Sequence, residues 1–170
     1  MKYLHAGLLA LMLMVMGGVY AETTDMEAIK RLVAEGKRSV ALEKLDERIA
    51  ASADDVEARF LKGLLLLERG DTDAARDVFE ELSRRFPRLP ESFNNLATIY
   101  AREGDYEKAR QALLSAIANS PDYPVVRANL GDLYAKLAAD AYRKAVELDP
   151  KDQASEAKLR LLDQLFAPGG

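Results

Sequence analysis

The side chains that most often carry out catalysis at neutral pH are almost missing from this chain. Its 170 residues include no cysteine and one histidine, His5. Thiolate and imidazole groups supply most nucleophile–base pairs, general bases and zinc ligands in proteins. Because His5 lies in an N-terminal segment that we expect to be removed, we expect no enzyme and no cofactor. An enzyme that uses only carboxylates, lysine, serine or tyrosine is the alternative.

Carboxylate clusters are the remaining candidates for chemistry. Asp71, Asp73 and Asp77 lie close together in GDTDAARD, but a calcium loop needs further oxygen ligands at set spacing and a distal glutamate. Capping of a helix explains these aspartates without a metal. Glu80 and Glu81 are adjacent, and neighbours on a helix point about 100° apart, which suits paired acid–base catalysis poorly. The sequence therefore predicts no metal site and no catalytic residue.

The charge of the chain argues against a nucleic-acid partner. It carries 28 acidic and 24 basic residues, a formal net charge of −4, whereas nucleic-acid binding needs a concentrated positive field. Arg84, Arg85 and Arg88 form one small basic cluster around Pro87. We interpret this cluster as a solvated loop, with contact to an acidic partner as the alternative.

The N-terminal segment has the pattern of an export signal. Residues 1–21 read MKYLHAGLLALMLMVMGGVYA, with a cation at Lys2, an apolar run from Ala6 to Met16, and Val19 and Ala21 before Glu22. This pattern predicts cleavage after Ala21 and export to the periplasm or outside the cell. A membrane anchor is the alternative, but the run is shorter than the roughly 18 residues that span a bilayer comfortably. After cleavage we expect no integral membrane span.

Residues of similar type recur at intervals of 34 along this chain. The remaining chain is rich in Ala, Leu, Glu, Arg and Lys, and its apolar residues recur at steps of three and four, which predicts an all-α protein. Several columns of similar residues repeat at the 34-residue interval: Gly36, Gly70, Gly104; Ala41, Ala75, Ala109; Gly63, Ala97, Gly131; Leu45, Phe79, Leu113; Pro87, Pro121. The first glycine column suits tight turns between helices, and the small residues suit close helix packing.

This pattern resembles the tetratricopeptide repeat, as in FLKGLLLLERGDTDAARDVFEELSRRFP and FNNLATIYAREGDYEKARQALLSAIANSP. The chain also resembles the repeat regions of secreted bacterial proteins. The resemblance implies repeats at 22–55, 56–89 and 90–123, a shortened repeat at 124–152 and a capping helix at 153–166. It further implies a right-handed α-solenoid whose first helices line a concave groove, and a scaffold that holds a protein or peptide partner.

The resemblance assigns a set of groove residues. Asn94 would pair with peptide amides, Arg102 or Lys136 would meet a charge, and Phe60 and Leu64 would hold an apolar anchor. The alternative for Phe60 and Leu64 is packing against the first repeat. The lysine, arginine and asparagine set of the carboxylate-clamp version of this fold is not found. The expected groove residues are Phe60, Leu64, Asn94, Thr98, Arg102, Asp132 and Lys136.

The last repeat lacks its turn. Ala138, Tyr142, Ala145 and Pro150 follow their counterparts by 29 residues instead of 34, so five residues that match 104–108 are absent. Between Pro124 and Pro150 no proline and only Gly131 interrupts the chain. We therefore expect one helix from about Val125 to Asp149, about 37 Å long at 1.5 Å per residue. A compressed turn at residues 137–140 is the alternative.

The outer half of such a helix needs cover for its apolar side chains. The capping helix at 153–166 could return antiparallel and supply it, or two chains could exchange projecting helices in a homodimer. The function we expect is a periplasmic scaffold that binds a protein or peptide, and the resemblance implies a role in assembly or maintenance of the cell envelope. The alternative is a dimerisation module that acts through helix 125–149. The possible oligomer contacts are Leu137, Ala141, Tyr142 and Ala145.

Overall fold

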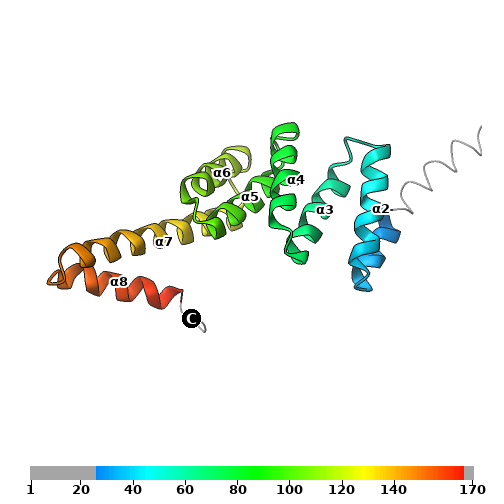
Figure 1. The fold of residues 1–170 in the computed structure, drawn as a ribbon. Helices are drawn as coiled ribbons and strands as arrows, with labels where there is room; N and C mark the ends of the chain where they lie inside the picture. The colour runs from blue at the N-terminus through cyan, green and yellow to red at the C-terminus, as the bar shows by residue number, and fades with distance from the viewer. Residues whose placement is uncertain (1–25, 167–170) are drawn as a thin grey trace, which may run out of the picture. The chain divides into compact units, whose positions relative to one another are not determined.

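The computed structural model describes residues 26–166, and this part of the chain consists of α-helices joined by short turns, without a β-strand (Figure 1). The expected signal segment, residues 1–21, lies outside the described residues. After a helix at residues 26–34, the helices are α2 (Arg38–Ala51), α3 (Val56–Arg69), α4 (Thr72–Arg85), α5 (Pro90–Glu103), α6 (Tyr106–Asn119), α7 (Pro124–Leu148) and α8 (Gln153–Leu165). The prediction of an all-α fold is confirmed.

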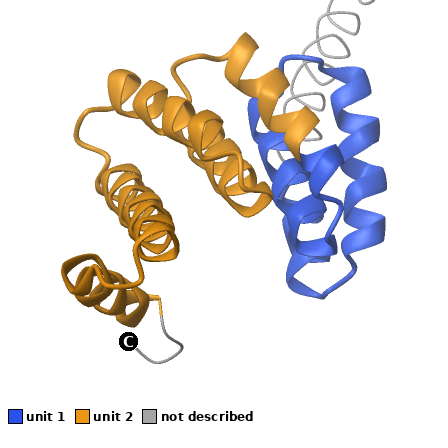
Figure 2. Ribbon diagram, turned by 60° about the vertical axis from the view of Figure 1, so that its left-hand side comes forward, with its two compact units in different colours: residues 1–75 blue, residues 76–170 orange. Residues whose placement is uncertain are grey.

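The chain forms two compact units, residues 1–75 and residues 76–170, and their boundary falls inside α4 (Figure 2). Each unit has its own buried apolar residues. The fully buried large side chains of the first are Ile29, Leu45 and Leu65; those of the second are Phe79, Leu82, Ile99, Leu113 and Val126. Leu45, Phe79 and Leu113 form one of the 34-residue columns, so this repeat in the sequence is a repeat of core positions.

Tight turns follow the first helix of three successive hairpins. Gly36, Gly70 and Gly104 have φ values of 75°, 90° and 82°, the left-handed conformation that glycine adopts without steric cost. The N–H of Gly104 donates to carbonyl oxygens of Tyr100 and Ala101, which closes the end of α5. The 34-residue spacing of these glycines is therefore a spacing of helix ends.

Aspartates in the loops cap two of the helices, whereas Asp71 pairs with an arginine. Asp55 accepts a hydrogen bond from the N–H of Ala58 at 2.9 Å and caps α3. Asp105 caps α6 in the same way. Asp71 accepts a hydrogen bond from Arg69 Nε at 2.6 Å. Within residues 26–166, no group of acidic side chains is arranged to hold a metal ion.

The prediction of one long helix in the last repeat is confirmed. α7 runs without a break for 25 residues, from Pro124 to Leu148, so the alternative turn at residues 137–140 is wrong. Proline in the first turn costs no hydrogen bond, because the first N–H groups of a helix have no partner in the helix. The expectation that Gly131 is small so that helices can pack closely is also wrong. A Cβ added there would meet nothing within 4 Å, so close packing does not require glycine at this position.

α8 returns antiparallel to α7 and packs against its outer half, which confirms the capping helix (Figure 1). Asp152 caps α8 by accepting a hydrogen bond from the N–H of Ser155 at 3.0 Å. The cover is one-sided: Ala139 is buried, but Ala141 is exposed and Leu148 keeps 76% of its surface exposed. The expectation that α8 covers the projecting apolar stripe therefore fails for Ala141 and Leu148.

The glycine turns and the continuous helix can be tested with a matched pair of variants. Gly104→Ala should lower the free energy of unfolding by about 1 kcal/mol, because alanine is strained at a φ of 82°. Gly131→Ala should raise it by up to about 1 kcal/mol, because alanine favours the interior of a helix. An added Cβ has open space at both positions, so urea unfolding followed by circular dichroism isolates the backbone effect. Equal effects of the two variants would contradict the assignment.

Candidate peptide-binding groove

The second unit contains a hollow of about 330 Å³ between α5, α6 and α7, called the groove below. Each helix contributes residues at steps of three or four, which lie on one face of a helix. Both α5 and α7 are first helices of their repeats, as the family resemblance requires. The groove is lined by Ala97, Thr98, Ala101 and Arg102 of α5, by Tyr106, Ala109 and Leu113 of α6, and by Asn129, Asp132, Leu133 and Lys136 of α7.

The floor of the groove is apolar and its rim is charged. Leu113 and Leu133 are buried, together with the small side chains of Ala97 and Ala109. Arg102 and Asp132 are exposed, and neither makes a hydrogen bond or ion pair with another described residue. These two groups are therefore free to meet a charged or polar ligand.

Lys136 is the third charged residue of the rim, and it is half-buried. Its Nζ lies 3.6 Å from Asp140 Oδ1. An ion pair at this distance on the surface is weak, typically up to about 1 kcal/mol. Lys136 can therefore turn towards an anionic ligand at little cost.

An amide pair joins the two helices beside the groove. Asn129 Nδ2 of α7 donates to Asn94 Oδ1 of α5 at 2.7 Å, and Thr98 Oγ1 donates to the carbonyl of Asn94 at 3.1 Å. Asn94 therefore ties α5 to α7, and it does not line the groove itself. Sequence reasoning missed Asn129, although Asn129 follows another asparagine, Asn95, by the repeat interval of 34 residues.

The groove gathers only part of the predicted residue set. Thr98, Arg102, Asp132 and Lys136 line it, whereas Phe60 and Leu64 belong to α3 in the other unit, where both are half-buried. Their role in binding stays a prediction. Tyr106 is a further wall residue that the sequence did not point to, since it starts a second helix.

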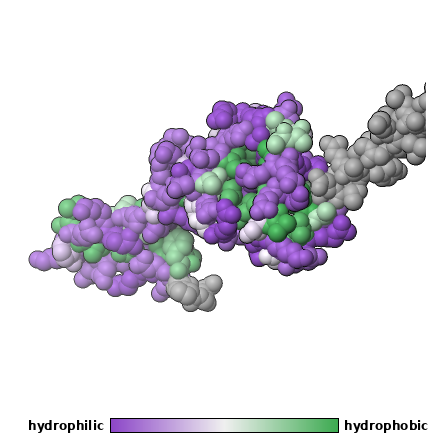
Figure 3. Space-filling view, turned by 45° about the vertical axis from the view of Figure 1, so that its right-hand side comes forward, coloured by the Kyte–Doolittle hydropathy of each residue, from purple (hydrophilic) through white to green (hydrophobic). Residues whose placement is uncertain are grey.

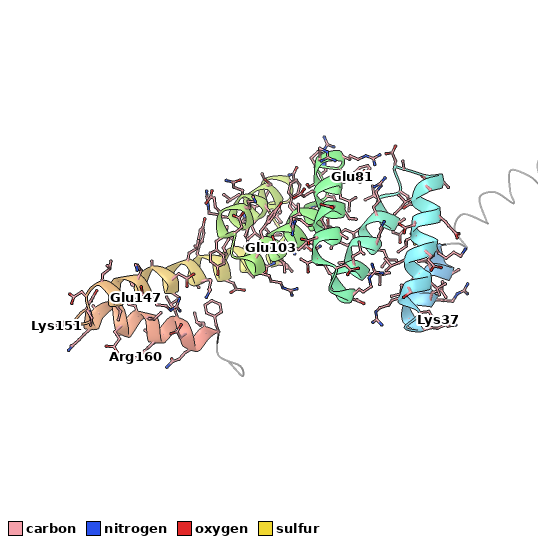
Figure 4. All side chains as sticks on the ribbon, in the orientation of Figure 1. Lys37, Glu81, Glu103, Glu147, Lys151 and Arg160 are labelled. Atoms are coloured by element: carbon pink, nitrogen blue, oxygen red, sulfur yellow. The ribbon has the colours of Figure 1, made fainter. Side chains whose placement is uncertain are left out.

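The position of α5 is fixed from its other side by α4. Tyr100 donates a hydrogen bond from its hydroxyl to Glu80 Oε1 at 2.7 Å. Arg76 Nη2 lies 2.6 Å from Glu103 Oε1 at the end of α5, where Figure 4 labels Glu103. Burial first, and then the hydrogen bond to Glu80, raises the pKa of Tyr100 to about 12. These two links hold the helix that carries Thr98 and Arg102.

Tyr100→Phe should lower the free energy of unfolding by about 1 kcal/mol at neutral pH, because it removes a partly buried hydrogen bond. The pKa of Tyr100 is about 12 in the folded chain and about 10 in an unfolded one. The stabilisation is therefore complete below about pH 10 and is lost as the pH rises through the folded pKa. Urea unfolding of both proteins at increasing pH measures this, and a difference that stays constant well above pH 10 would contradict it.

Comparisons with known proteins agree with this architecture. A family model described as tetratricopeptide repeat matches residues 26–90 and residues 63–124. The TPR repeat-containing protein YpiA of Bacillus subtilis (strain 168) is 34% identical over 112 residues, which are 62% of this chain and 26% of YpiA. The match thus spans about a quarter of that relative.

Solved structures share the fold. MamA 41-end from Desulfovibrio magneticus RS-1 has a TM-score of 0.62 and 21% identity, and 85% of each chain is covered. YrrB, described as a TPR protein with an unusual peptide-binding site, has a TM-score of 0.53 and 30% identity over 58% of this chain and 50% of YrrB. Family model, relative and structures agree with the 34-residue columns, and the chain belongs to the tetratricopeptide repeat family.

Proposed function

We propose that the groove binds an extended segment of another protein, so that the chain acts as a binding scaffold. The observation that carries this proposal is the pairing of an apolar floor with Arg102 and Asp132, two charged side chains without a partner among the described residues. The family supports a protein-binding scaffold in general terms, and the peptide-binding site named for YrrB is consistent with it.

The shape of the groove suggests what its ligand would be. Its volume of about 330 Å³ is at the low end of ligand sites in proteins, which suits one or two side chains of a peptide. The small side chains of Ala97, Ala101 and Ala109 leave room for an apolar residue. Arg102 and Lys136 would attract a carboxylate next to that residue, and Asp132 would accept from a backbone N–H or a basic side chain.

The binding proposal predicts a charge-specific loss. Peptides selected from a random display library on the purified chain should bind Arg102→Glu at least tenfold more weakly, because a hydrogen bond to a charged group contributes about 1.5–3 kcal/mol. Arg84→Glu is the matched control, since Arg84 is exposed on α4 and does not line the groove. Fluorescence anisotropy gives the Kd values. Equal weakening by both variants, or the absence of any enriched peptide, would overturn the proposal.

We further propose that the scaffold works in the periplasm or outside the cell, in assembly or maintenance of the envelope. Support comes from the cation, apolar run and small residues of positions 1–21. Among the helices of residues 26–166, none is both long and apolar enough to cross a membrane.

Export of the protein can be measured directly by cell fractionation. When the protein is expressed in a Gram-negative host, it should appear in the periplasmic fraction. Its mass should be that of a chain that begins at Glu22, because cleavage is expected after Ala21. Intact mass spectrometry of the fractions checks this. Full-length protein that stays in the cytoplasmic fraction would contradict export, whereas uncleaved protein in the membrane fraction would favour the anchor.

A further inference from the structure

An apolar stripe on the outer half of α7 is only partly covered within the described residues: Leu137 and Ala145 are half-buried, and the Tyr134 side chain interacts with Arg110 of α6. The stripe consists of Tyr134, Leu137, Ala141, Ala145 and Leu148. At about 100° per residue, these five positions fall within roughly a quarter turn of the helix. Tyr134 is 47% exposed and Leu148 is 76% exposed, and Ala141 is exposed too.

The stripe continues the packing face of the inner half of α7. Val126 and Leu133 lie close to the same side of the helix and are buried, in the part of α7 that packs with α6. Beyond residue 134 the helix runs on, because the turn that would fold the second helix of the repeat back onto the first is missing. The same face of α7 is therefore buried at one end and open at the other.

α8 widens this open area instead of closing it. Lys158 Nζ lies 5.0 Å from the ring centroid of Tyr142 at one edge of the α7–α8 hairpin, and Arg143 Nη2 lies 3.5 Å from Asp163 Oδ1 at the other. Helical spacing places Leu161 and Leu165 at the Lys158 edge, beside the stripe on α7. Their exposed fractions are 65% and 67%.

The other surface of the hairpin is charged. Figure 4 shows Arg160 on the side of α8 away from α7, and Figure 3 shows hydrophobic atoms at the surface beside the C-terminal end. The stripe on α7 together with Leu161 and Leu165 is called the open face below. An exposed apolar area of this kind, bordered by charges, is typical of an interaction surface.

We propose that a second copy of this chain covers the open face, with the two α7 helices antiparallel about a two-fold axis at Ala141. The steps along the stripe are three, four, four and three residues, so the pattern reads the same in both directions. An antiparallel copy therefore sets Leu137 opposite Ala145, a large side chain beside a small one, and Tyr134 opposite Leu148 at the two ends of the stripe. Ala141 faces its own copy, and its small side chain permits close approach of the helices.

Charge complementarity supports the same register. Lys144 borders the stripe, and the antiparallel arrangement brings it within one helical turn of Asp140 of the second copy. The two-fold axis creates this pair twice. Within one chain, Lys144 pairs with Glu147 at 2.9 Å and Asp140 pairs with Arg143. Such exposed pairs are worth little, so rearranging them costs little.

The size of the open face predicts the strength of the dimer. The stripe is about 21 Å long at 1.5 Å per residue, and two packed helices are roughly 20 Å across. The resulting footprint of about 400 Å² is half of the roughly 800 Å² per partner that a standard stable interface buries. The dimer should therefore be reversible, with a Kd in the micromolar range.

This dimer differs from an exchange of projecting helices, because each α8 stays on its own α7. It is also separate from ligand binding: the polar groove residues Asn129, Asp132 and Lys136 lie about half a turn away from the stripe on α7, and Leu133, which lies nearer to it, is buried in the groove floor. Loss of peptide binding and loss of the dimer can therefore be observed separately.

The first test measures mass against concentration. Light scattering of the mature chain should show the mean mass rising from that of one chain to that of two as the concentration increases across the micromolar range. The double variant Leu148→Glu, Leu161→Glu should raise the concentration at the midpoint of dimerisation at least tenfold. Its melting temperature at low concentration should be unchanged, because both residues are exposed. Val40→Glu is the control, since Val40 is 43% exposed on α2. A wild-type chain that is monomeric at high micromolar concentration, or a double variant that dimerises equally well, overturns the proposal.

The second test uses the absence of cysteine from the sequence. Ala141→Cys should form a covalent dimer on mild oxidation, because the axis brings this residue to its own copy, whereas exposed Ala118→Cys on α6 should not. Leu137→Cys alone should stay monomeric but should crosslink when mixed with Ala145→Cys. Crosslinking of Leu137→Cys to itself would indicate parallel helices and overturn the register. Equal crosslinking at Ala141 and Ala118, or at neither, overturns the interface.

Discussion

A helix in this chain folds back on its predecessor within a repeat only where a residue with positive φ allows a tight turn. Gly36, Gly70 and Gly104 supply that conformation, and the last repeat has no counterpart. Much of what distinguishes this protein depends on this constraint. Because α7 cannot turn, its inner half completes a groove with α5, while its outer half carries α8 away from the repeats.

The groove depends on fixed distances between helices. The Asn94–Asn129 amide pair joins α5 to α7 on one side, and the links from Tyr100 and Arg76 hold α5 against α4 on the other. Small side chains on the floor keep the space open. The charged groups of the rim then remain available, because the structural hydrogen bonds are made by other residues. This division suits a rigid binding surface.

A single helix thus serves two surfaces. One side of α7 contributes polar residues to the groove, and the opposite side presents the apolar stripe. The proposed dimer would give the scaffold two grooves, and two linked sites bind a repetitive or multivalent partner more tightly than one. The deletion in the last repeat is then a gain of an interaction surface, since the face that a folded hairpin would have buried is left open.

The sequence by itself determined the helical class, the family and the continuous α7, because each depends on local rules. The 34-residue columns mark core positions and helix ends, and the five missing residues remove a turn without interrupting the 3.6-residue period. The sequence also pointed to four groove residues through their places in the repeat: Thr98, Arg102, Asp132 and Lys136. Their roles in binding remain predictions.

Tertiary structure alone decided how the helices are rotated against one another. Periodicity says that a helix has an apolar face, but the neighbours it packs with select which part of that face is covered. That is why the sequence did not show that Asn94 pairs with Asn129, that Tyr106 lines the groove, or that Ala139 is buried while Leu148 is exposed. Each of these depends on contacts between residues far apart in the chain, whose geometry comes from packing of the whole unit.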